Sequence, residues 1–329
     1  MKLAIIGATG MVGQTVLKVL AEKNIKIDDL ILTASERSVG KKIKFQNKEI
    51  KICNLDSAVA QKPEIVIFAT GKEISLEWAP RFAENGSFVV DNSSAWRMHE
   101  NIKLIVPEVN ISNLTKEDKI ISNPNCSTIQ LVVILWQLHL IYELKRVVVS
   151  TYQSVSGSGF KGVNQLEKER KGIIPEIKAY PHQIDMNCIP HGGSFLENGY
   201  TDEEMKLTNE SRKILGIPNL QLTSTVVRVP VLVGHSECVN IEFHKKPNIF
   251  KIIEILKQTK SVIVKDEPSK NKYPMAIDAY DKDEIFVGRI REDNSCENAI
   301  NLWIVADNLR KGAATNAVQI AEYIQKKFL

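Results

Sequence analysis

The stretch Leu3-Ala4-Ile5-Ile6-Gly7-Ala8-Thr9-Gly10-Met11-Val12-Gly13 decides the fold of this 329-residue chain. An apolar run suited to a buried strand leads into a turn with glycines three apart, and the pattern from Val12 to Glu22 predicts a helix. Such glycines permit a tight turn, close approach of the backbone to phosphate, and close packing of helix on strand. The stretch predicts a dinucleotide site; the alternative is a merely structural turn.

Strand–helix alternation continues through the first part of the chain. Apolar runs predict strands at residues 30–34, 65–69 and 88–91, and a helix at 76–83. Strands that are apolar on both faces and alternate with helices are typical of a parallel sheet. From about residue 126 the predicted strands are longer. They lie at 147–153, 220–233, 237–244, 284–290 and 299–306, with helices at 201–215 and 249–258.

We therefore predict an α/β protein. Its N-terminal domain has a Rossmann-type doubly wound parallel sheet, and its second domain is α+β with a mixed, largely antiparallel sheet. The dinucleotide-binding domain comprises residues 1–125 plus 307–329, because an amphipathic helix at 312–328 can pack back on it. Residues 126–306 form the catalytic domain.

Composition excludes several classes of protein. A hydrophobic share of 43% with 25% charged residues is that of an ordinary globular protein. The net charge of +4 is too small to indicate a nucleic-acid partner. The longest apolar run, residues 129–138, is too short for a bilayer, so no membrane association is expected. Five scattered cysteines without an export signal favour reduced thiols and a cytoplasmic location.

The end of the second predicted strand bears on the choice of cofactor. An unphosphorylated ribose is typically held there by a lone acidic side chain. This chain has Ser35-Glu36-Arg37-Ser38, and the hydroxyls and guanidinium of Ser35, Arg37 and Ser38 suit a 2′-phosphate. The segment therefore favours NADP, while Glu36 leaves NAD open.

Cys126 is the candidate nucleophile. The segment Asn123-Pro124-Asn125-Cys126-Ser127-Thr128 precedes an apolar helix at 129–139. A thiol at a helix N-terminus has a lowered pKa, and the free N–H groups there can hold an oxyanion. A cysteine at a helix start is more often inert packing, but the upstream dinucleotide turn favours a reactive one, since cysteine thioesters and hydride transfer combine in aldehyde chemistry.

Two further residues stand out near the predicted strands of the second domain. His235 lies in a Gly-His turn that can expose an acid–base group, unlike the other five histidines. Arg228 lies in an apolar strand and needs a carboxylate or phosphate partner, or else forms a salt bridge on the sheet. A zinc site built from Cys188, His191, His235 and Cys238 has permitted spacing, but the segments look unlike zinc knuckles, so no metal is expected.

The segment from Thr201 has the spacing of a helix-capping box, with Thr201 as N-cap and Glu204 reaching back to it. Glu203 and Lys206 are then neighbours on one helical face. From the pattern alone they are a solvated surface pair.

Taken together, these residues resemble the aspartate-semialdehyde dehydrogenases. The resemblance covers essentially the whole chain. It rests on Gly7–Gly13, on Asn123–Thr128, on Ser150-Thr151-Tyr152-Gln153-Ser154-Val155-Ser156-Gly157, and on Arg228-Val229-Pro230-Val231 with Gly234-His235. The order and spacing of these segments fit the shorter branch of that family.

The resemblance implies a role for each matching residue. Cys126 corresponds to the nucleophile, His235 to the acid–base residue, and Gln153 to the group that orients the intermediate. Arg228 corresponds to the clamp on the substrate carboxylate and Glu203 to the partner of its amino group, while Arg97 and Lys206 hold phosphate. The implied NADP contacts are Gly7, Thr9, Gly10, Met11, Val12, Ser35, Arg37, Ser38, Ser156, Gly157 and Asn316.

The implied reaction is the NADP-dependent, phosphate-releasing reduction of L-4-aspartyl phosphate to L-aspartate 4-semialdehyde through a cysteine thioester. The second domain would also serve dimerisation, giving a homodimer or a dimer of dimers. Two alternatives stay open: N-acetyl-glutamyl-phosphate reductase, which shares the turn, cysteine and histidine, and a non-catalytic dinucleotide-binding sensor.

Overall fold

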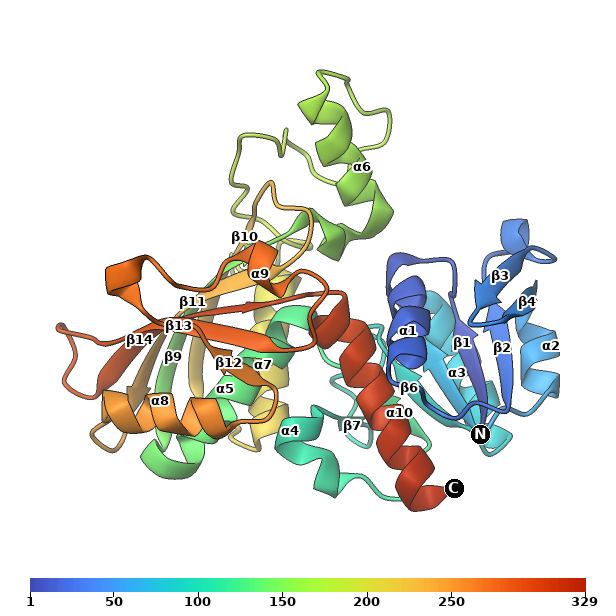
Figure 1. Ribbon diagram of the computed structural model, residues 1–329, viewed down its shortest axis with the longest axis horizontal. Coiled ribbons are helices and arrows are strands. Elements are labelled where there is room, and N and C mark those ends of the chain that lie inside the picture. Colours follow the sequence, from blue (N-terminus) through green and yellow to red (C-terminus); the bar gives the residue numbers. More distant parts are fainter. The chain divides into compact units, whose positions relative to one another are not determined.

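The computed structural model describes all 329 residues, which form two compact units (Figure 1). The first contains residues 1–125 and 313–329, and the second contains residues 126–312. Residues 307–312, expected in the first, lie with the second. The reason is electrostatic: the Asp307 carboxylate accepts the backbone N–H of Asp281 at 2.8 Å, and Arg310 pairs with Asp281 and Asp283 at 2.9 Å each.

The first unit is built on an eight-stranded sheet whose neighbouring strands are parallel except for one hairpin. Chain order reverses at the central strand, which creates the topological switch point where doubly wound sheets bind ligands. In spatial order the strands are β3 (Lys42–Phe45), β4 (Lys48–Cys53), β2 (Asp29–Thr33), β1 (Lys2–Ile6), β5 (Ile65–Phe68), β6 (Phe88–Asp91), β8 (Ile120–Ser122) and β7 (Lys103–Leu104).

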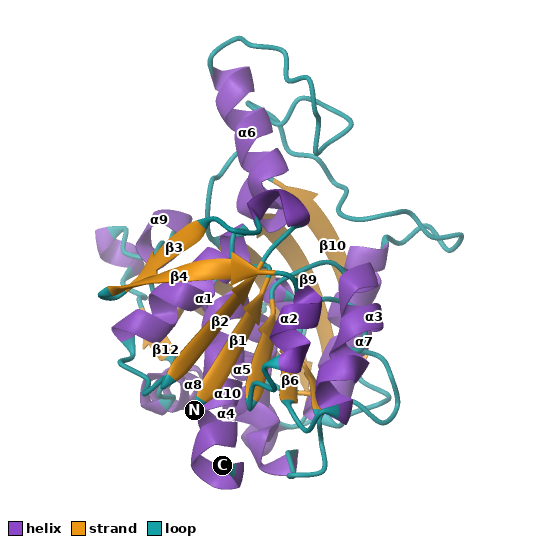
Figure 2. Ribbon diagram, turned by 90° about the vertical axis from the view of Figure 1, so that its right-hand side faces the viewer, coloured by secondary structure: helices purple, strands orange, loops and turns teal.

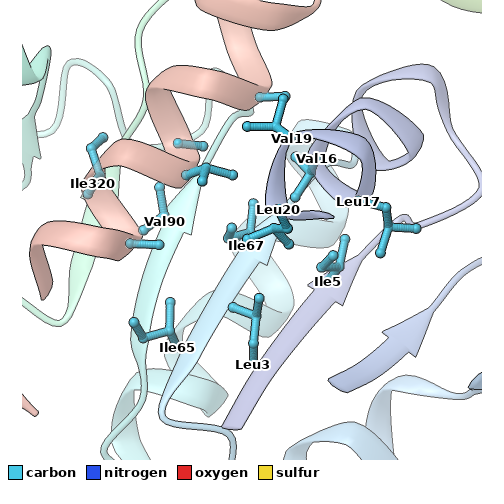
Figure 3. Close-up of a cluster of buried hydrophobic side chains, with 14 of the residues drawn as sticks. Leu3, Ile5, Val16, Leu17, Val19, Leu20, Ile65, Ile67, Val90 and Ile320 are labelled. Atoms are coloured by element: carbon cyan, nitrogen blue, oxygen red, sulfur yellow. The ribbon is translucent and has the colours of Figure 1, made fainter. Parts of the chain in front are cut away.

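Helices cover both faces of this sheet because successive strand residues point to opposite sides. Figure 3 shows Leu3 and Ile5 of β1 on the face covered by α1 (Met11–Glu22) and α10 (Thr315–Phe328). Ala4 and Ile6 belong to the core on the opposite face, with α2 (Leu55–Ala60) and α3 (Lys72–Glu84). The unit also contains α4 (Pro107–Asn110) and short 3₁₀ turns at η1 (Glu36–Ser38) and η2 (Ile111–Asn113).

The second unit has a six-stranded mixed sheet. Its central strands are antiparallel, as expected, while parallel pairs lie at both edges. The strand expected at 220–233 ends at Arg228, because Pro230 has no N–H to continue a ladder. In spatial order the strands are β10 (Gln221–Arg228), β9 (Leu144–Gln153), β11 (His235–Phe243), β14 (Ala299–Ala306), β13 (Ile285–Glu292) and β12 (Val262–Val264).

Helix α5 (Cys126–Tyr142) is the centre of this unit. It is apolar on all sides, and it packs on β9, β11 and β14 and against α7 (Asp202–Leu215) and α8 (Ile249–Gln258). Helix α6 (Gly159–Arg170) and the irregular segment 171–200 extend away from the sheet (Figure 2). The remaining elements are α9 (Ala276–Ala279), η3 (Val155–Ser158), η4 (Pro268–Lys270) and a π-helical turn, η5 (Arg310–Ala314).

None of these helices combines the length and the apolar character needed to cross a membrane.

Candidate active site

The glycine turn of the first unit is shaped by close backbone contacts. Gly7 has φ +89°, and a Cβ there would lie 2.4 Å from the carbonyl oxygen of Ala69; a Cβ on Gly13 would lie 2.2 Å from the Gly7 oxygen. Gly10 is less crowded, because a Cβ there would lie no closer than 3.4 Å to any neighbouring atom. It is the N-cap of α1, where no side chain caps the helix and the first turn has no acidic residue. The turn is therefore suited to a pyrophosphate at Thr9–Val12.

The other proposed cofactor residues of this unit lie in two places. Ser35, Arg37 and Ser38 follow β2, where η1 exposes the Arg37 side chain. Asn316 is buried on α10, and its amide donates to the Ile105 carbonyl at 3.0 Å and to the Asn123 side chain at 2.7 Å. Both amide hydrogens of Asn316 thus hold neighbouring chain segments in place.

Arg97, expected to bind phosphate, is also buried in the first unit. Its Nη2 donates to the Asn92 carbonyl oxygen at 2.8 Å. This bond fixes the guanidinium relative to the loop after β6.

Cys126 is the first residue of α5, as predicted, and it is partly buried. The backbone of η5 packs closely on it, since a Cβ on Gly312 would lie 2.9 Å from the Cys126 Cβ. The thiol therefore lies at the N-terminal end of a buried helix, where the helix dipole favours the thiolate.

Gln153 lies at the end of β9, fully buried. Its Nε2 donates a 2.9 Å hydrogen bond to the Ser127 hydroxyl, next to Cys126, while its Oε1 has no hydrogen-bond partner. An unsatisfied buried acceptor is costly, so Oε1 is suited to receive a donor from a bound ligand.

His235 was expected in a turn that can expose it, but it is the first residue of β11 and is fully buried. Its Nδ1 accepts the backbone N–H of Ser154 at 3.0 Å and lies 3.0 Å from the Ser154 hydroxyl, while its Nε2 has no partner. Burial, with the positive charge of Arg228 as a second cause, holds the pKa of His235 well below its ordinary value. The imidazole is therefore neutral.

Asn308, on the loop after β14, organises this region. Its Oδ1 accepts the Gly234 N–H at 3.0 Å and the Ser154 hydroxyl at 2.9 Å, and its Nδ2 donates to the Ser156 hydroxyl at 2.9 Å. Sequence reasoning missed Asn308, for which the only signal was a polar pair directly after a buried strand.

Arg228 and His235 meet at Gly157. A Cβ on Gly157 would lie 2.8 Å from the Arg228 Nη1 and 3.1 Å from the His235 Nε2. Arg228 is buried at the end of β10, and its Nη1 donates to the Ser154 carbonyl at 3.4 Å. It has no carboxylate partner, so the alternative of a sheet salt bridge is wrong and its charge is available to an anionic ligand.

The start of α7 carries the expected capping box, in which Thr201 and Glu204 bond each other's backbone. Glu203 is mostly buried, and Lys206 pairs with it at 3.1 Å and with Asp202 at 2.8 Å. Burial opposes the charge of Lys206, but Glu203 and Asp202 prevail and raise its pKa. The interpretation as a solvated surface pair is wrong for Glu203.

A second residue missed in the sequence is Glu237. It is fully buried on β11, opposite the equally buried Thr151 of β9, and neither of its carboxyl oxygens has a hydrogen-bond partner. Burial raises the pKa of Glu237 well above its ordinary value, opposed only by the Gln130 side chain. Burial therefore favours the protonated form of Glu237.

The geometry gives no support to a zinc site. No group of three or more His, Cys, Asp or Glu side chains is placed to hold a metal ion.

The two units match two known domains in chain order. Residues 2–117 match the family described as "Semialdehyde dehydrogenase, NAD binding domain", and residues 135–311 match "Semialdehyde dehydrogenase, dimerisation domain". A parallel sheet that matches an NAD-binding domain, followed by a mixed sheet that matches a dimerisation domain, is thus the architecture of a semialdehyde dehydrogenase.

Relatives that match over their full length identify the family within this class. The chain is 48% identical to an aspartate-semialdehyde dehydrogenase of Aquifex aeolicus, covering 100% of this chain and 99% of the relative. It is 43% identical to that of Bacillus subtilis, covering 98% and 97%. A Vibrio cholerae structure, described as aspartate semialdehyde dehydrogenase II complexed with ASA, superposes with a TM-score of 0.95 at 42% identity, covering 99% and 98%. The chain belongs to the aspartate-semialdehyde dehydrogenase family, which confirms the resemblance seen in the sequence.

Proposed function

We propose that the protein catalyses the NADP-dependent, reversible reduction of L-4-aspartyl phosphate to L-aspartate 4-semialdehyde and phosphate, in the biosynthesis of the aspartate-family amino acids. The observation that carries this proposal is in the second unit: Cys126 starts the buried helix α5, and Gln153 bonds its neighbour Ser127 while leaving an acceptor free. A thioester on Cys126 divides one difficult substitution into two easier steps.

The charges of the second unit suit an amino-acid substrate. Arg228, buried without a carboxylate partner, is the proposed clamp for the α-carboxylate. Glu203 is the proposed partner of the α-amino group, and Lys206 a proposed phosphate ligand, as is Arg97 in the first unit. Leaving the buried charge of Arg228 unpaired is costly, so a substrate that lacks the α-carboxylate is disfavoured.

The cofactor residues fit a dinucleotide. The open Gly10 at the uncapped start of α1 leaves room for a pyrophosphate, and Arg37 with Ser35 and Ser38 suits a 2′-phosphate. In the second unit, Ser156 and Gly157 are the proposed contacts. When bound, the reduced nicotinamide supplies a hydride to the thioester carbon.

The protein groups have defined tasks in the chemistry. The Cys126 thiolate attacks the acyl-phosphate carbon, phosphate leaves, and the thioester forms. Reduction of the thioester gives a hemithioacetal on Cys126, which collapses to the aldehyde and restores the thiolate. Gln153 orients the bound acyl group. His235 serves the substrate oxygen on which negative charge develops in both steps.

Two comparisons support the proposal further. The Vibrio cholerae relative is described as complexed with ASA, which favours aspartate semialdehyde as the ligand of this chain. The match to a dimerisation domain supports a homodimer.

The test follows nicotinamide absorbance with L-aspartate 4-semialdehyde and NADP⁺, with and without inorganic phosphate. We expect phosphate-dependent reduction in the wild type, its loss in Cys126→Ala, and its retention in Cys188→Ala, which removes an exposed thiol of the same unit. Turnover only with N-acetyl-glutamate semialdehyde would show that this aldehyde is the substrate instead. No turnover with either aldehyde would favour a non-catalytic dinucleotide-binding protein.

A further inference from the structure

The backbone around His235 determines which of its nitrogens carries the proton. A backbone N–H can only donate, and the Ser154 amide points at Nδ1 from 3.0 Å. Nδ1 must therefore present its lone pair, and the neutral ring carries its hydrogen on Nε2. Adding a second proton would place an N–H at Nδ1 directly against the Ser154 N–H.

The surrounding groups reinforce this arrangement. Asn308 accepts the Ser154 hydroxyl and the Gly234 N–H, so it fixes the residues on both sides of the imidazole. Gln130, one turn beyond Cys126 on α5, donates to the His235 carbonyl at 3.4 Å. The charged group beside the ring is Arg228, which disfavours a second positive charge. No carboxylate contacts the imidazole to stabilise a cation.

The Nε2–H is left without a partner inside the protein. It lies beside Gly157, which is exposed, and next to the guanidinium proposed to hold the substrate carboxylate. A buried donor that is unsatisfied at the edge of a site is ready to bond a ligand oxygen.

We propose that His235 acts as a fixed, uncharged hydrogen-bond donor, through Nε2–H, to the substrate carbonyl oxygen, and that Ser154 is the positioning residue that sets this tautomer. The inference rests on the proposed function and refines the acid–base role that the sequence suggests for His235.

The atom balance of the reaction agrees with such a donor. When the thiolate adds to the acyl phosphate, the carbonyl oxygen becomes an oxyanion, and it returns to a carbonyl as phosphate leaves. When the thioester is reduced, the same oxygen again becomes an oxyanion and returns to a carbonyl as the Cys126 thiolate leaves. The oxygen needs a donor in both steps but takes up no net proton, and the proton of the overall reaction ends on the released phosphate.

The first test is ¹⁵N NMR of the full-length protein labelled at histidine, with the His235 signals assigned by their loss in His235→Gln. We expect a bare Nδ1 and a protonated Nε2 from pH 8 down to pH 5.5, unchanged in Ser154→Ala, which keeps the decisive backbone amide. A hydrogen on Nδ1, or titration near the ordinary histidine pKa of about 6.5, overturns the proposal.

The second test compares kcat/KM of His235→Gln and His235→Ala across pH. Glutamine offers an uncharged N–H near the position of Nε2 but transfers no proton. Loss of an oxyanion donor costs about 10²–10³-fold in kcat, so we expect that loss in the alanine variant and at least about tenfold recovery in the glutamine variant. Equal losses in both overturn the donor role.

These outcomes are separate from failure of the proposed function. A wild-type protein without turnover refutes the function, whereas an active wild type with a titrating or Nδ1-protonated His235 refutes only this inference. If the glutamine variant does not fold, the His235 signals are assigned by elimination from variants that each replace one of the other histidines, and by the changes that Ser154→Ala causes. The NMR spectrum of the wild type then shows which nitrogen of His235 carries the proton.

Discussion

The Gln153 amide and the Ser127 hydroxyl join the end of β9 to the first turn of α5 by a 2.9 Å hydrogen bond. The carbonyl oxygen of the same Gln153 side chain is buried without a hydrogen-bond partner. One side chain thus supports the helix that begins at Cys126 and offers an acceptor to a ligand.

Replacing Gln153 by leucine is expected to lower kcat/KM about 10–100-fold, because a buried donor of the ligand left without its acceptor costs about 1–3 kcal/mol. Ser127→Ala is the matched control because it removes the tether and keeps the Gln153 carbonyl oxygen, and its loss should stay below about tenfold. The phosphate-dependent NADP⁺ assay measures both. If Ser127→Ala loses as much as Gln153→Leu, then Gln153 acts only by holding the helix.

The proposed preference for NADP rests on Arg37. Its exposed guanidinium at the end of β2 is expected to bind the 2′-phosphate, so Arg37→Ala should raise the KM for NADP⁺ about 10–100-fold and leave that for NAD⁺ within about threefold. Lys44→Ala, which removes an exposed charge on β3, is the control. Equal losses with the two cofactors would refute the assignment of the 2′-phosphate to Arg37.

Two glycines of the same turn should respond differently to alanine. A Cβ on Gly13 would lie 2.2 Å from the Gly7 oxygen, so Gly13→Ala should destabilise the fold by about 1–3 kcal/mol through overpacking. A Cβ on Gly10 meets nothing closer than 3.4 Å, so Gly10→Ala should leave the melting temperature of the cofactor-free protein unchanged. It should nevertheless weaken NADP⁺ binding at least about tenfold, measured by calorimetry. Unchanged affinity would argue against pyrophosphate at this turn.

Local patterns were sufficient to predict much of the fold. The bounds expected for β6, β14 and α8 match the structure, since each is a strong apolar pattern with clear ends. The parallel pairing of β10 with β9 was not predicted. The two strands are separated by α6, the segment 171–200 and α7, and no local pattern reports such a long-range register.

The residues of the candidate site show the same contrast between local sequence patterns and long-range contacts. Cys126 and His235 were proposed from their immediate neighbours in sequence; the structure places Cys126 at the start of α5, as expected, but buries His235 at the start of β11 instead of exposing it in a turn. Ser154 and Asn308 were missed because their bond joins positions 154 residues apart. Glu237 was missed because a charged residue is not expected in a protein core. The alternation of side chains along β11, with its mixed polar residues, nevertheless places Glu237 on the buried face.

The burial of Glu237 predicts an unusual dependence of stability on pH. Its pKa is raised in the folded protein, whereas an unfolded glutamate titrates near about 4.3. Between these two values the folded state holds a proton that the unfolded state has lost. The stabilisation associated with that proton is fully present below the unfolded pKa and is lost as pH rises toward the folded pKa, at about 1.4 kcal/mol per pH unit.

Glu237→Gln keeps the size and the neutral hydrogen-bonding groups but does not titrate, so it is not subject to this loss. We expect its melting temperature to exceed that of the wild type by a margin that widens from pH 5 to pH 8. Glu254→Gln, an exposed change on α8, should show no such trend. A constant difference at all pH values would mean that Glu237 is ionised in the folded protein, and its carboxylate would then need a partner that the buried face of β11 does not provide.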